Sequence, residues 1–144
     1  MTPPLRLSPA TPVFHHARVW PRSRGACGDS GTATANRIAH RGCDLVAQLT
    51  AAAFAIPYGE IAAATRRTRE VAFARQCAMY LARVGLVMNY RDIGRAFGRD
   101  RTTAAHACRQ VESCRDDPAV DELLGRLERA CCVLRFRSVV RVRP

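Results

Sequence analysis

A single glycine between two short helical patterns constrains the fold of this chain more than any other feature. Gly98 can adopt a left-handed backbone conformation at no steric cost, and it separates residues 90–97 from residues 101–112. In the first segment Ile93 and Phe97 share one side of a helix because they are four residues apart. The second segment has a stripe of mostly small apolar residues, namely Ala104, Ala107, Cys108 and Val111. The spacing therefore predicts two short helices joined by a tight turn.

Capping residues precede both of these helices. Asn89 and Asp100 are residue types that accept the first free amide hydrogens of a helix, and a carboxylate at Asp100 also complements the helix dipole. Arg101, Thr102 and Arg109 are left on the outward side of the second helix. This arrangement is typical of a helix-turn-helix, whose second helix presents its N-terminal side chains to the DNA major groove.

Helical spacing continues through most of the remaining chain. It predicts a first helix over residues 36–55, a short one over 58–64, a third over 70–84 and a last one from Pro118. Pro57 ends the first helix, because proline disfavours a helical conformation in the residue before it. We therefore expect an all-α fold of about six helices that contains the helix-turn-helix.

The two ends of the chain differ from its centre in composition. Residues 1–35 are rich in proline and contain no acidic residue before Asp29, so we expect them to be disordered. Residues 36–131 then form the helical domain, and residues 132–144 a basic C-terminal tail. Apolar residues and arginines alternate from Val133 to Arg143, which is strand periodicity. A lone strand is not stable, so the tail is either frayed or acts as a phosphate clamp or dimerising edge.

The charge of the chain favours a polyanionic partner. The formal net charge is +11, and all 23 basic residues are arginine. Arginine binds phosphates and guanine edges through two parallel hydrogen bonds, whereas lysine acts as a point charge. Compositional drift in a GC-rich genome would also explain the absence of lysine. Drift does not explain why Arg66, Arg67 and Arg69 lie so close together in the sequence.

The sequence lacks the motifs of several classes of function. The seven cysteines include no C-x-x-C pair, so we expect reduced thiols in the core, no metal and no cofactor. No apolar run approaches the roughly 20 residues of a membrane span, and no signal peptide is evident. A phosphate-binding loop needs a lysine, so we expect no bound nucleotide. No catalytic constellation stands out. We expect a protein of the cytoplasm and nucleoid that is not an enzyme.

The helix-turn-helix segment also carries a family resemblance. Residues 97–111, with the core Thr-Thr-Ala-Ala-His-Ala-Cys-Arg, resemble the signature of the DNA-binding domain of the bacterial replication initiator DnaA. Residues 66–76 resemble that domain's basic loop and the helix after it. The likeness runs from about Cys43 to about Ala130. It implies a DnaA-like DNA-binding domain with a Trp-repressor-like fold, here as a free-standing module without the ATPase.

The resemblance implies roles for particular residues. Arg67 takes the place of the arginine that enters the minor groove, and Asp100, Arg101 and Thr102 match residues that read base edges in the major groove. Thr103 lies beside them. The remaining positions match residues that hold the DNA backbone or belong to the two DNA-contacting segments: Arg66, Arg69, Arg75, Gln76, Arg83 and Arg99.

The chain departs from the family pattern at two positions. The family usually has two glycines after the phenylalanine, but here Gly98 is followed directly by Arg99. The family also usually has histidine where Arg101 stands. The first departure bears on the angle between the two helices, and the second on the preferred base sequence. Asp100 retains a second interpretation, in which it serves only as a helix cap.

Two classes of function follow from this pattern. The first is sequence-specific binding of double-stranded DNA by a regulator of transcription or of replication initiation. The second is a protein-interaction module of the replication apparatus with nonspecific affinity for nucleic acid. Arg67 together with Arg101 favours the first, because an interaction module has no need for base-reading side chains at both grooves. The sequence leaves the oligomeric state open, and a monomer is the simplest expectation.

Overall fold

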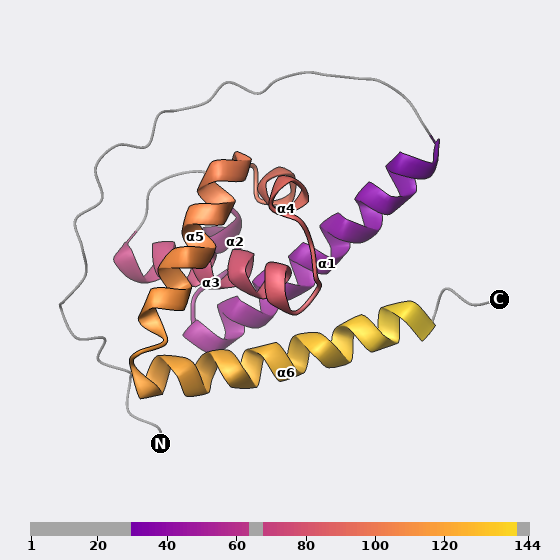
Figure 1. The fold of residues 1–144 in the computed structure, drawn as a ribbon. Helices are drawn as coiled ribbons and strands as arrows, with labels where there is room; N and C mark the ends of the chain where they lie inside the picture. The colour runs from indigo at the N-terminus through magenta and orange to yellow at the C-terminus, as the bar shows by residue number, and fades with distance from the viewer. Residues whose placement is uncertain (1–29, 64–67, 141–144) are drawn as a thin grey trace.

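A computed structural model describes residues 30–63 and 68–140, and all regular secondary structure in these ranges is helical (Figure 1). The all-α prediction is therefore confirmed. In chain order the helices are α1 (Ser30–Phe54), α2 (Tyr58–Ala62), α3 (Arg69–Val84), α4 (Tyr90–Ala96), α5 (Arg101–Cys114) and α6 (Pro118–Val140).

Two helix boundaries differ from the sequence-based prediction by more than two residues. Helix α1 begins at Ser30 rather than near Asn36. Helix α6 continues to Val140, so the expected boundary at Cys131 is wrong and the alternating pattern after it does not form a strand as far as Val140. The residues after Cys131 alternate between apolar and arginine, as in a strand, but they continue the helix. An isolated strand would have no hydrogen-bonding partner. The expected disorder is wrong for residues 30–35, because they form the first turns of α1. Residues 1–29, 64–67 and 141–144 lie outside the described residues. The rest of the expected N-terminal disorder and the centre of the basic loop fall in these ranges.

The helices enclose a core with α3 at its centre. Leu81, Cys77 and Ala78 of α3 are fully buried, and α3 packs against α1, α5 and α6. The small side chains of Cys77 and Ala78 allow the helix axes to approach closely. From α6, Val120, Leu124, Leu127 and Cys131 complete the core on one side. A second cluster, which includes Ile93, Met79 and Ala104, lies beneath the helix-turn-helix.

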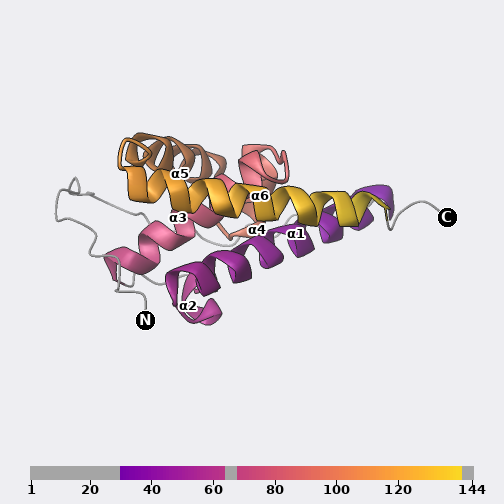
Figure 2. The same cartoon turned by 90° about the horizontal axis from the view of Figure 1, so that it is seen from below.

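The two longest helices extend beyond this core. Figures 1 and 2 both show that the N-terminal end of α1 and the C-terminal end of α6 project past the other helices on the same side of the molecule. Within the described ranges, no helix combines the length and the apolar character needed to cross a lipid bilayer.

Candidate nucleic-acid interface

The turn between α4 and α5 is tight and depends on Gly98. Helix α4 ends at Ala96, and Gly98 has a φ of +62°. This is the left-handed region that glycine enters without strain. The Arg99 amide donates to the Gly94 carbonyl at 2.7 Å and closes the turn. The predicted role of Gly98 is confirmed, and a single glycine is sufficient to reverse the chain here.

A second glycine is equally important, and the sequence analysis missed it. Gly94 lies inside α4, where an ideal Cβ would be only 2.8 Å from the Arg99 carbonyl oxygen and 3.0 Å from the Asp100 carbonyl carbon. No real side chain fits so close to a backbone, so this position sets how closely α4 approaches the start of α5. A glycine inside a helix lowers the stability of that helix. Its presence within the predicted helix over residues 90–97 was therefore the one sequence signal that a side chain does not fit at this position.

Asp100 is the N-cap of α5. Its Oδ1 accepts a hydrogen bond from the Thr103 amide at 2.6 Å, and its Oδ2 accepts one from the Thr103 hydroxyl at 3.0 Å. The bond from the Thr103 amide is the main cause that holds the pKa of Asp100 below its ordinary value. Asn89 caps α4 in the same way, since its Oδ1 accepts from the Asp92 amide at 2.9 Å. Both predicted caps are confirmed.

The cap leaves two outward-facing side chains at the start of α5. Arg101 and Thr102 are exposed, whereas both carboxylate oxygens of Asp100 are engaged with Thr103. The predicted inner stripe of α5 is buried as expected, at Ala104, Ala107, Cys108 and Val111. The packing therefore fixes the rotation of α5 and turns the Arg101–Thr102 edge toward solvent.

Arg75 lies in a different environment from the one that a surface phosphate contact implies. It is 8% exposed. Its Nε donates to the Ile61 carbonyl and its Nη2 to the Glu60 carbonyl, both at 2.9 Å. Arg75 thereby binds the end of α2, where carbonyl groups lack helical partners. Burial, and then the positive charge of Arg99, lower the pKa of Arg75.

The other candidates from the sequence fall around this site. Gln76 is half-buried on α3 beside Arg75, and Arg69 is the exposed first residue of that helix. Arg83 is exposed but folded back, because its Nη1 donates to the Met88 carbonyl at 2.8 Å and its guanidinium lies 4.9 Å from the centre of the Tyr90 ring. Arg66 and Arg67 lie outside the described residues.

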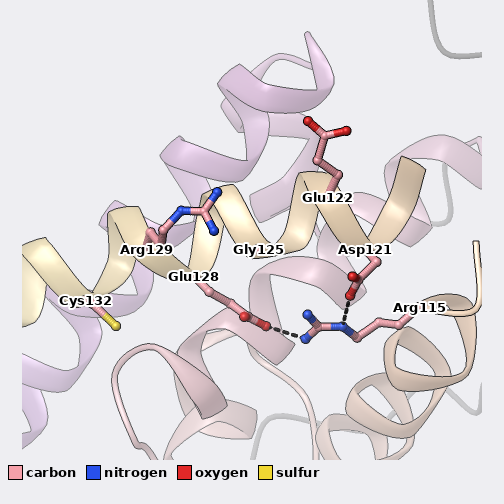
Figure 3. Close-up of a pocket in the computed structure, with 7 residues that line it drawn as sticks. All are labelled: Arg115, Asp121, Glu122, Gly125, Glu128, Arg129 and Cys132. Atoms are coloured by element: carbon pink, nitrogen blue, oxygen red, sulfur yellow. Dashed lines mark hydrogen bonds and ion pairs between the residues drawn. The ribbon is translucent and has the colours of Figure 1, made fainter. Parts of the chain in front are cut away.

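A polar network fixes the far end of α5. Arg115, which follows α5, donates through Nε to Asp121 and through Nη1 to Glu128, both on α6 and both at 2.6 Å (Figure 3). The same Nη1 donates to the Tyr80 hydroxyl of α3 at 2.6 Å, and that hydroxyl donates to Glu128 at 2.8 Å. Arg115 therefore joins α3, α5 and α6 at the end of α5 remote from Arg101.

Cysteines fill the core beneath these helices. Cys43, Cys77, Cys108 and Cys131 are buried as free thiols. Burial is the main cause that raises the pKa of Cys108 and of Cys131 to about 11. These thiols are therefore protonated at neutral pH, and a protonated thiol is a weak nucleophile. Their surroundings match small packing residues, as the sequence analysis predicted.

Comparison with known proteins identifies the matched region. Residues 43–111 match the protein family described as the bacterial dnaA protein helix-turn-helix. The chain is 46% identical over 66 residues to the chromosomal replication initiator protein DnaA of Caulobacter sp. (strain K31). It is 48% identical over 61 residues to that of Bartonella quintana (strain Toulouse). The first match covers 44% of this chain and 14% of the relative, and the second covers 40% and 12%.

A solved structure shares the fold as well as the sequence pattern. It is a crystal structure of a DNA replication initiation factor, which superposes with a TM-score of 0.63 at 29% sequence identity. The superposition covers 71% of this chain and 32% of that one. The likeness therefore extends beyond the helix-turn-helix to most of this chain.

Proposed function

Because residues 43–111 form a helix-turn-helix domain of the bacterial DnaA type, we propose that this chain binds double-stranded DNA in a sequence-specific manner. In this role it regulates transcription or the initiation of replication at the nucleoid. The observation that carries the proposal is the start of α5, where a rigid cap leaves Arg101 and Thr102 exposed at the position from which a recognition helix reads bases.

The geometry at the N-terminus of α5 supports a division of roles. Arg101 and Thr102 carry base recognition, because an arginine can bind O6 and N7 of guanine and a threonine methyl can pack on a thymine methyl. Asp100 and Thr103 are bonded to each other, so in our proposal they orient the helix more than they read the bases. An arginine in place of the family's usual histidine shifts the preferred sequence toward guanine at that position.

The basic loop supplies the second groove contact in this proposal. Arg67 enters the minor groove, where narrow A·T-rich stretches attract guanidinium groups. Arg66 and Arg69 flank it and bind phosphates. Arg69 is the first residue of α3, and α3 packs directly against α5. The basic loop therefore leads into a helix whose position relative to the recognition helix is fixed by packing.

Arg99 and Arg83 are assigned to the phosphate backbone in this proposal, whereas Arg75 stays bonded to the end of α2. Arg99 acts on Arg75 electrostatically and lies in the turn that precedes α5, so the two side chains concentrate positive charge beside the recognition helix. Gln76 and Arg83 extend this contact along α3. Arg83 would exchange its bond to the Met88 carbonyl for a phosphate oxygen. Contacts of this kind fix register and orientation without reading sequence.

A protein-interaction module with nonspecific affinity for nucleic acid is the competing function. Its strongest support is the net charge of +11, which alone attracts any nucleic acid. It gives no reason for the exposed Arg101–Thr102 edge. The two functions make different predictions about base preference.

The test begins with selection of duplexes from random sequence by the full-length protein. Binding of Arg101→Ala and Arg67→Ala is then measured against a panel of single-base variants of the selected site. Arg101→Ala should cost roughly 1–3 kcal/mol and relax preference at one or two adjacent base pairs. Arg67→Ala should weaken binding mainly to sites with an adjoining A·T run. The double variant should be close to additive, because contacts in separate grooves share no partner.

Arg126→Ala is the matched control for loss of one positive charge. Arg126 is exposed on α6, and its guanidinium pairs with the Glu122 carboxylate at 2.8 Å. It should change affinity little and preference not at all. If Arg101→Ala and Arg67→Ala lower affinity equally on every duplex, both are phosphate contacts and sequence-specific binding is wrong.

A further inference from the structure

A small pocket lies beside the turn of the helix-turn-helix, between α1, α2 and the end of α4. Its most deeply buried lining residues are Cys43 and Ala47 of α1 and Ile61 of α2, none of which is more than 4% exposed. Phe97 and Gly98 line it from the side of the turn. Its volume is about 200 Å³, below the roughly 300–1,000 Å³ of sites for drug-sized ligands. A ligand that fits this pocket is therefore small.

The pocket exists because small residues line it from each of the surrounding elements. They are Ala47 of α1, Ala62 of α2, Ala96 of α4 and Gly98 of the turn. Protein interiors are otherwise close-packed, and larger side chains at these positions would fill the space. Ala62 is exposed, so it lies at the rim, where a substitution can close the pocket without disturbing the core.

Two polar side chains line the exposed side of the pocket. The Tyr58 hydroxyl donates to Oδ1 of Asp44 at 3.2 Å, and both residues are exposed. A carboxylate has about four lone-pair positions, so Asp44 can accept further hydrogen bonds beside the one from Tyr58. The face of an aromatic ring such as that of Tyr58 also attracts a cation. An apolar interior with these two groups at its edge suits a ligand that has one charged end.

The local charge at the pocket is negative, although the chain as a whole is strongly basic. Burial first, and then the charges of Asp44 and Asp92, raise the pKa of Cys43 to about 12. Two carboxylates therefore act on the buried side of the pocket, and none of the described arginines lines it. The Cys43 thiol stays protonated at neutral pH and contributes no charge of its own. This field favours a positively charged ligand and disfavours an anion.

We propose that this pocket binds a small organic ammonium ion with an apolar body. The ammonium group donates a charge-assisted hydrogen bond to the Asp44 carboxylate, and the apolar body packs against Ile61 and Phe97. A bare calcium or magnesium ion fits less well, because it needs at least about six oxygen ligands and Asp44 supplies the only carboxylate of the lining. The site is additional to DNA binding, because none of its lining residues is among those assigned to DNA.

The test is a titration of the full-length protein with phenethylammonium, followed by the backbone amide signals in NMR spectra. The amides of Ile61 and Gly98 should shift and reach saturation. Phenethyl alcohol, which has the same shape without the charge, should bind at least tenfold more weakly, and hydrocinnamate should not bind there. Asp44→Asn should weaken binding of the ammonium probe at least tenfold, and Ala62→Leu should block it. Asp116→Asn is the matched control, since it removes an exposed carboxylate that does not line the pocket.

Three results would overturn the proposal. One is the absence of a saturable shift at these amides with phenethylammonium. Another is equal or tighter binding of phenethyl alcohol or hydrocinnamate, which would make the pocket a purely apolar or an anion-binding site. The last is binding of the ammonium probe that Asp44→Asn leaves unchanged. The melting temperatures of Asp44→Asn and Ala62→Leu should stay close to that of the wild type, because both positions are exposed. This measurement separates loss of binding from unfolding.

Discussion

Asp100 and Thr103 hold each other at the start of α5. The carboxylate of Asp100 accepts both the amide and the hydroxyl hydrogen of Thr103, at 2.6 and 3.0 Å. The side chains at the two ends of the Asp100–Thr103 segment are thereby fixed, and the two between them are free to reach outward. The contribution of this cap to the stability of α5 can therefore be tested by replacing Asp100.

Asp100→Ala should lower the free energy of unfolding by about 1 kcal/mol near neutral pH, as loss of an N-cap usually does. The pKa of Asp100 is lowered in the folded state. Its contribution to stability is therefore present above the unfolded pKa and is lost as the pH falls through the folded pKa. Urea unfolding at a series of pH values should show wild type and variant converging in acid. A difference that stays constant down to about pH 2 would mean that the ionised carboxylate is not what stabilises the helix.

Three glycines should respond to alanine in three different ways. Gly94→Ala should destabilise the domain strongly, by several kcal/mol, because its Cβ would collide with the backbone of Arg99. Gly98→Ala should cost about 1 kcal/mol, since the space is open but φ is positive. Gly125→Ala should stabilise by roughly 0.5–1 kcal/mol, because the nearest atom to its ideal Cβ is Arg129 Nη1 at 3.6 Å.

The order of these three glycine variants can be read from thermal unfolding. Gly98→Ala is the control for the free-energy cost of placing a side chain in a left-handed backbone conformation. Gly125→Ala is the control for adding a methyl group to a helical glycine that has space around it. If Gly94→Ala melted at the wild-type temperature, α4 and α5 would not approach as closely as the structure indicates.

Arg115→Leu should be far more costly than Arg126→Leu, although both remove an arginine paired with a glutamate of α6. Arg115 also binds Asp121 and Tyr80, and its side chain is 31% exposed. Arg126 and Glu122 are 64% and 69% exposed, and a surface pair of that kind contributes under about 0.5 kcal/mol. Loss of Arg115 leaves Glu128 without its cation, for which we expect a cost of about 1–3 kcal/mol.

A double-mutant cycle between Arg115→Leu and Glu128→Gln isolates this pair. The coupling should exceed that of Arg126→Leu with Glu122→Gln, measured in the same way by chemical unfolding. Equal couplings would show that the Arg115 network behaves as an ordinary surface ion pair and does not fasten α6 to the end of α5.

Much of the helix-turn-helix could be predicted because its signals are local. The caps Asn89 and Asp100, the turn at Gly98 and the inner stripe of α5 depend on residues at most a few positions apart. The role of Gly94 depends on where the next helix begins. The position of Arg75 depends on carbonyls of α2 fourteen or fifteen residues away. Such features arise from packing between helices, and residue spacing along one helix does not reveal them.

The same reasoning explains the error at the C-terminal end. Alternation after Cys131 predicted either a frayed tail or a strand. Helix α6 continues instead to Val140. Its first half is already fixed against the core by Leu124 and Leu127, and extension of an existing helix needs no new nucleus. Tertiary anchoring of the preceding turns therefore outweighed a weak local pattern.

Arg75→Lys separates a structural role from a phosphate contact. Lysine keeps the positive charge but replaces a planar group that binds two carbonyls at once with a single ammonium. We expect a loss of about 1–2 kcal/mol in the free energy of unfolding, since the bonds to the Glu60 and Ile61 carbonyls cannot both be kept in the same geometry. Affinity for the selected duplex should also fall, because α2 and the loop that follows it are no longer held against α3.

Arg99→Lys is the control for that experiment, because it keeps the charge beside Arg75 at a position whose side chain is less buried. It should reduce affinity with little change in stability. Both variants keep the positive charge, so the slope of log K against log salt should stay unchanged in both, and the melting temperature distinguishes the two cases. Arg75→Lys should lower the melting temperature. An Arg75→Lys variant that melts like the wild type but binds the selected duplex less tightly would show that Arg75 acts on the DNA directly and that its bonds to α2 contribute little.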